Sequence, residues 1–119
     1  MATITNLFID QGSTFNSVVT LKNQDGTPMN LTNFIVKSQF RKSYRSSQSV
    51  TFTTSIYNAA TGRIRLQLPA DTSSSVKAGR YLFDVEITSP TGEKYRALEG
   101  IVVISPEITQ IWATTLLLP

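Results

Sequence analysis

The stretch GRYLFDVEIT, residues 79–88, alternates apolar and polar side chains with a period of two. The apolar positions from Tyr81 to Ile87 would therefore share one face of a strand, and the polar positions between them would share the other face. The SPTG sequence that follows, residues 89–92, supplies a proline with a fixed φ and a glycine that can take a positive φ. Residues 93–104 then return along the first arm. We predict a β-hairpin here.

The return arm changes phase along its length. Tyr95 and Ala97 fall on one alternation, whereas Gly100 and Val102 fall on the other. A β-bulge, which inserts one extra residue into a strand, reconciles the two phases. We place this bulge at Glu99 and Gly100.

The rest of the chain predicts further short strands separated by turns. They are rich in β-branched and aromatic residues and cover residues 4–9, 15–22, 34–40, 51–56 and 64–68. We expect the first of them at a sheet edge and the last two to form a second hairpin. One helical turn is expected at residues 70–76, capped by Asp71 or Thr72. No segment repeats at a fixed period and no linker divides the chain, so one domain accounts for it.

We therefore predict an all-β fold, an immunoglobulin-like antiparallel β-sandwich of about seven strands. The sandwich would occupy residues 1–106, and residues 107–119 would form an apolar C-terminal arm or an extra strand. The chain has 119 residues, of which 40% are apolar and 16% charged, which suits one globular β-domain.

The composition excludes several classes of function. The chain has neither cysteine nor histidine, which removes disulfides, thiolate chemistry, the commonest general base and the usual zinc ligand. The formal charge of +3 is spread along the sequence and does not favour nucleic-acid binding. The amino-terminal residues lack the basic and apolar regions of a secretory signal. The apolar stretch at 111–118 is far shorter than the roughly 20 residues that span a bilayer. We expect no metal, no cofactor and no membrane association.

Two carboxylates invite a catalytic interpretation. Asp84 and Glu86 stand two apart on a strand, roughly 6.5 to 7 Å from each other on one face, a spacing that a glycosidase pair could use. The alternative, which we favour, is that they form cross-strand ion pairs on the solvent face with Arg63, Arg65 or Arg96. No catalytic residue is assigned.

Two loops carry polar residues with other interpretations. Asp25 could join a calcium site, but it lacks the companion acidic residues, so a turn role is favoured. Residues 41–49 are basic and serine-rich, which predicts an exposed, mobile loop. Four of its residues combine positive charge with an aromatic ring and are candidate loop contacts: Arg41, Lys42, Tyr44 and Arg45.

The last residues of the chain are strongly apolar. Left in water, such a segment would favour aggregation, so it either folds back on its own core or buries against a neighbouring subunit. Its candidate protein-interaction residues are Ile108, Ile111, Trp112, Leu116, Leu117 and Leu118.

Six segments resemble a known family. They are QGSTF (11–15), DGTPMNLTNF (25–34), GRI (62–64), LPADT (68–72), AGRYLFDVE (78–86) and VISPEIT (103–109). Together they are similar to small immunoglobulin-like proteins encoded among the virion structural genes of tailed bacteriophages, in particular those of contractile-tailed cyanobacterial phages. The style is that of the N-terminal domains of baseplate upper proteins. The resemblance covers roughly residues 4–109 and consists of turn and strand markers, not catalytic signatures.

The resemblance implies a non-enzymatic structural protein of the virion, made in the host cytoplasm and associated with the tail or baseplate. We expect it in multiple copies, in contact with itself and with other virion proteins through its sandwich faces and terminal arms. A capsid decoration protein on the phage head is an alternative. A receptor- or glycan-binding module that uses the loops at 23–28 and 41–49 is a further one.

Overall fold

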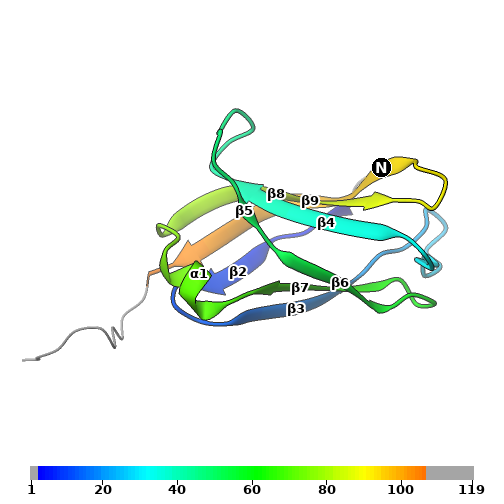
Figure 1. The fold of residues 1–119 in the computed structure, drawn as a ribbon, viewed down its shortest axis with the longest axis horizontal. Helices are drawn as coiled ribbons and strands as arrows, with labels where there is room; N and C mark the ends of the chain where they lie inside the picture. Colours follow the sequence, from blue (N-terminus) through cyan, green and yellow to red (C-terminus); the bar gives the residue numbers. More distant parts are fainter. Residues whose placement is uncertain (1–2, 107–119) are drawn as a thin grey trace, which may run out of the picture.

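A computed structural model describes residues 3–106, which form two β-sheets stacked face to face (Figure 1). The elements are β1 Thr3–Ile4, β2 Leu7–Asp10, β3 Phe15–Thr20, β4 Ile35–Arg41, β5 Val50–Thr51, β6 Thr53–Asn58, β7 Arg63–Leu68, α1 Ala70–Ser74, β8 Gly79–Thr88 and β9 Lys94–Ser105. The larger sheet has the order β1-β9-β8-β4-β5, with β2 also paired to β9, and the smaller sheet has the order β3-β7-β6. The predicted all-β fold is confirmed. Its assignment to the immunoglobulin type stays a prediction.

Both predicted hairpins are present. Strands β8 and β9 pair antiparallel around the turn at 89–92, and β6 and β7 pair antiparallel in the smaller sheet. The bulge, however, lies elsewhere than predicted. Val85 pairs with Leu98 and Glu86 pairs with Arg96, so the extra residue is Ala97.

Gly100 has a different role from the one we assigned to it. It is the position at which β9 passes closest to the connection between β1 and β2, and a Cβ atom there would overlap the carbonyl oxygen of Thr5. The glycine therefore permits the approach of another segment instead of forming a bulge.

The first predicted strand is confirmed at an edge of the larger sheet, but it is broken in two. Both parts, β1 and β2, run parallel to β9, whereas the predicted sandwich was antiparallel. At the break, the Thr5 N–H donates to the carbonyl oxygen of Glu99 at 2.9 Å. The side-chain oxygen of Asn6 accepts from the N–H of Ile101 at 3.3 Å, which replaces a backbone acceptor.

An aromatic cluster fills the core between the sheets. Phe52 is 2% exposed, and its ring centroid lies 5.8 Å from Phe15, 5.3 Å from Phe40 and 6.5 Å from Phe83. Phe15 belongs to the smaller sheet and the other two partners belong to the larger one. Phe52 itself separates β5 from β6, the point where the chain passes from one sheet to the other. The residue that joins the sheets in sequence thus also joins them in space.

The short helix α1 closes one end of the sandwich. Its N-cap is Pro69, whose side chain cannot cap, and so the predicted caps Asp71 and Thr72 are wrong; both lie inside the helix. The helix is held by Ser73 instead. This buried hydroxyl donates to the Ser13 carbonyl oxygen at 2.7 Å and accepts from the Gly12 N–H at 3.1 Å.

Candidate functional site

A groove of about 360 Å³ crosses the outer face of the larger sheet. Alternation puts every second residue of β4, β8 and β9 on this face, since the residues between them are buried. The strand register arranges the outward residues in rows across the sheet. One row holds Lys37 and Glu86 beside Arg96, and the next holds Gln39 and Asp84 beside Glu99. A third row begins with Arg41 and Leu82.

Positive and negative charges balance in the groove. Arg96 lies between two carboxylates, with its Nε 3.3 Å from the Asp84 carboxylate and its Nη1 3.4 Å from the Glu99 carboxylate. These groups are between one third and about one half exposed, so each ion pair contributes only ~0–1 kcal/mol to stability. Lys37 and Glu86 are in register across β4 and β8 but form no ion pair among residues 3–106. They remain available to a ligand.

The loop between β4 and β5 forms one wall of the groove and projects from the sheet at the top of Figure 1. The Ser46 N–H donates to the Ser43 carbonyl oxygen at 3.1 Å, which closes a turn. Arg41 donates to the Ser46 carbonyl oxygen and to the Gln39 side-chain oxygen, both at 3.2 Å. Tyr44, on this turn, has 76% of its surface exposed and lines the groove.

The four predicted loop contacts therefore separate into groups. Arg41 and Tyr44 line the groove, whereas Lys42 turns away, with its Nζ 5.0 Å from the centre of the Tyr81 ring. Arg45 is exposed and does not line the groove. The predicted exposure of the loop is confirmed, and its mobility stays a prediction.

The ion-pair interpretation of the two carboxylates is correct in part. Asp84 pairs with Arg96, as one of the predicted options required. Arg63 and Arg65 are wrong as partners, because they lie on β7 in the other sheet. Arg65 instead lies 4.6 Å from the Tyr57 ring.

Asp25 has the predicted turn role. Its carboxylate accepts from the backbone N–H of Thr27 at 3.0 Å and from the Thr27 hydroxyl at 2.6 Å. These hydrogen bonds favour the ionised form and lower the pKa of Asp25, the side-chain bond having the larger effect. Among the described residues, no group of three or more acidic side chains could hold a metal ion.

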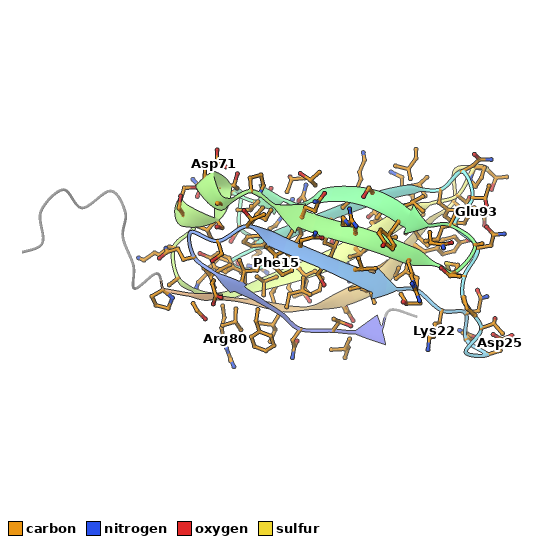
Figure 2. All side chains as sticks on the ribbon, turned by 90° about the horizontal axis from the view of Figure 1, so that it is seen from below. Phe15, Lys22, Asp25, Asp71, Arg80 and Glu93 are labelled. Atoms are coloured by element: carbon orange, nitrogen blue, oxygen red, sulfur yellow. The ribbon has the colours of Figure 1, made fainter. Side chains whose placement is uncertain are left out.

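The two loops proposed for a receptor-binding module lie apart. Residues 23–28 precede β4 and residues 42–49 follow it, so the strand separates them. Figure 2 shows Asp25 and Glu93 at one end of the sandwich and Asp71 of α1 at the other. A single site that combines both loops is therefore not formed.

A second surface feature is apolar and lies at the sheet edge. Phe8 is 71% exposed, because its neighbours Leu7 and Ile9 point into the core, and Ile4 on β1 is 75% exposed. Phe8 is in register with Val103, which is half-buried on the same outer face. We call Ile4, Phe8, Ile101 and Val103 the edge patch. The side of β2 that faces away from β9 has no strand partner among residues 3–106.

Neither feature was predicted in full from the sequence. Lys37, Gln39 and Glu99 were missed because nothing in one strand says which strand lies beside it. The signal that was present is their outward phase in the alternation.

The six predicted arm residues, between Ile108 and Leu118, lie outside the described residues. In the part of the chain that the structure describes, no helix has the length and apolar character needed to cross a membrane.

Comparisons with known proteins show no family for this chain. No protein-family model matches the chain, and no curated protein matches it. Among solved structures, an internalin-like protein of Listeria monocytogenes is 16% identical with a TM-score of 0.43; the match covers 89% of this chain and 28% of that one. A family 123 glycoside hydrolase from Clostridium perfringens is 13% identical with a TM-score of 0.39, covering 87% and 23% respectively. The chain spans less than a third of either protein, and neither likeness carries a functional argument.

Proposed function

We propose that this chain is a non-enzymatic structural protein of a tailed-bacteriophage virion, associated with the tail or baseplate and present in multiple copies. The family resemblance of residues 4–109 supports the viral assignment. The two-sheet architecture supports the mechanical role, since its paired strands and single core give a rigid block.

The observation that carries the assembly role is the edge patch. Phe8 on β2 and Ile4 on β1 are mostly exposed, beside half-buried Val103 and Ile101, and the outer edge of β2 is unpaired within residues 3–106. An exposed apolar edge promotes contacts with other chains, and natural proteins usually protect such edges with charges or proline. β2 carries only Asp10, at its end. This surface therefore suits burial against a neighbouring subunit.

The segment after residue 106 is a second apolar region in the sequence. It contains Trp112 and the run from Leu116 to Leu118. Two contact regions on each copy allow a symmetric assembly in which many weak contacts act together.

The proposal is tested by mass spectrometry of purified virions after separation of tails from heads. Recovery of the chain in the tail fraction is expected. Recovery in heads alone would assign it to capsid decoration, and absence from complete virions would contradict the structural role altogether.

A further inference from the structure

We propose that the groove on the larger sheet binds a neutral polyhydroxylated ligand, a short glycan unit, around Tyr44 and Glu86. This binding activity goes beyond the structural role and does not depend on it. The proposed site uses the loop at 41–49 together with the outer face of the larger sheet, and it does not use the loop at 23–28.

The size of the groove limits the ligand. A volume of about 360 Å³ lies near the lower end of the range of roughly 300–1,000 Å³ that small-molecule sites occupy. The floor is formed by strands β4, β8 and β9, which are fixed by their hydrogen-bonded register. A rigid floor with one loop wall fits one or two sugar rings better than a long polymer enclosed on all sides.

The polar groups match hydroxyl chemistry. A hydroxyl group both donates and accepts hydrogen bonds, so its site needs acceptors and donors close together. Glu86 offers an acceptor and Lys37, opposite it in register, offers donors. The Gln39 amide provides both in the next row. Hydrogen bonds to charged groups are the stronger kind, which suits the binding of neutral hydroxyls.

Tyr44 supplies the apolar part of the site. Its exposed ring stands on the loop wall of the groove, which Leu82 also lines. An aromatic ring presents a flat apolar face with a polar tip, which can contact the C–H face of a sugar ring while its hydroxyl bonds to water or ligand. Without a ligand, this exposed aromatic side chain contributes no packing to the core.

The balanced charges of the groove favour a neutral ligand over a charged one. The groove contains three cationic side chains and three carboxylates. Such a surface has little net field to attract a polyanion or a cation, and Arg96 is already paired with Asp84 and Glu99. A phosphorylated, sulfated or nucleic-acid ligand would meet Glu86 and its neighbours unfavourably.

The test uses the full chain on an array of defined oligosaccharides, with neutral and acidic members, followed by calorimetry on the strongest neutral ligand. We expect binding to neutral members, with an affinity that changes little between low and high salt. Tyr44→Ala and Glu86→Gln should each weaken it by roughly tenfold or more. Tyr57→Ala is the matched control, since Tyr57 is an exposed tyrosine on the other sheet. Thermal melts of all three variants check folding.

Three outcomes would overturn the proposal. The first is no binding to any neutral oligosaccharide. The second is binding confined to acidic members and lost at high salt, which would indicate an anion site. The third is binding to neutral members that both groove variants retain at full strength, which would place the ligand elsewhere on the chain.

Discussion

The backbone N–H of Phe52 donates a 3.0 Å hydrogen bond to the carbonyl oxygen of Ser38, at the point where the chain leaves the larger sheet for the smaller one. The side chain of Ser38, 1% exposed, in turn donates to the carbonyl oxygen of Asp84 at 2.6 Å. The crossing between the sheets is therefore tied to the central strands that form the floor of the groove.

Loss of the Phe52 ring should destabilise the whole sandwich. Phe52→Ala removes a buried ring that contacts both sheets, and we expect the free energy of unfolding to fall by about 3–5 kcal/mol. Phe8→Ala is the matched control, because the same ring is deleted from an exposed position, and it should cost less than about 1 kcal/mol. Denaturant unfolding measures both. Equal losses in the two variants would show that the core is not where the structure places it.

The close approach at Gly100 gives a second stability prediction. A Cβ atom at Gly100 would collide with the carbonyl oxygen of Thr5, so Gly100→Ala should displace the edge strands and cost more than about 3 kcal/mol. At Gly92 a Cβ atom would meet open space, and only the positive φ of 93° opposes it. Gly92→Ala should therefore cost about 1 kcal/mol. The Gly100→Ala variant should therefore have the lower melting temperature of the two. A Gly100→Ala variant more stable than Gly92→Ala would contradict the close approach of Gly100 to Thr5.

Asp25 should titrate below the ordinary range of an aspartate. Since its native pKa is lowered, the stabilisation that it provides is present above the pKa of the unfolded chain and is lost as the pH falls through the native pKa. Thr27→Ala removes the hydrogen bond from the Thr27 hydroxyl, which has the larger effect on the pKa. The pKa of Asp25 should therefore rise towards its ordinary value. NMR titration of the side-chain carboxyl carbon measures this shift.

The Asp25 experiment has a built-in control. Thr32 makes the same pair of hydrogen bonds to Asn30, at 3.0 and 2.6 Å, but Asn30 does not titrate. Thr32→Ala should therefore leave the pKa of Asp25 unchanged. If the pKa of Asp25 is unchanged in the Thr27→Ala variant, the hydrogen bonds from Thr27 are not the cause of the lowered pKa.

The C-terminal segment should be needed for assembly but not for folding. Deletion of residues 111–119 is expected to leave the β-sheet circular dichroism spectrum intact, because residues 3–106 already contain both sheets and the core. Assembly should be lost with the apolar residues. The control is a full-length chain in which Thr114 and Thr115 are replaced by alanine. It keeps the apolar residues of the segment and should assemble normally. If the truncated chain is unfolded, the deleted segment is instead part of the hydrophobic core.

The hairpins were predictable from sequence because their information is local. Alternation from Tyr81 to Ile87, followed by the turn at 89–92, specifies both the strand and its reversal. The parallel pairing of β1 and β2 with β9 was not predictable, because alternation tells which face a residue occupies and not which strand lies beside it. The misplaced bulge has the same origin. Gly100 is required by Thr5, a residue distant in sequence, and only the fold reveals that contact.

Only those residues of the candidate site whose pattern is local could be predicted from the sequence. Arg41 and Tyr44 were recognised from loop composition, and Asp84 and Glu86 from their spacing on one strand. Lys37 and Glu99 come from other strands, so the groove exists only once the register brings the rows together. The edge patch was not predictable from sequence, because the exposure of Phe8 depends on which face of β2 meets the core.

Incorporation of a Phe8→Asp chain into virions is the most direct test of the proposed assembly role. The chain would be supplied to a phage that lacks its own copy, and quantitative mass spectrometry of purified particles would measure how much is incorporated. Because Phe8 is exposed, the variant should fold with an unchanged melting temperature, yet its incorporation should be lost. Val18→Asp, on a partly exposed position of the other sheet, should be incorporated normally. Incorporation of the folded Phe8→Asp chain at the wild-type level would contradict the account.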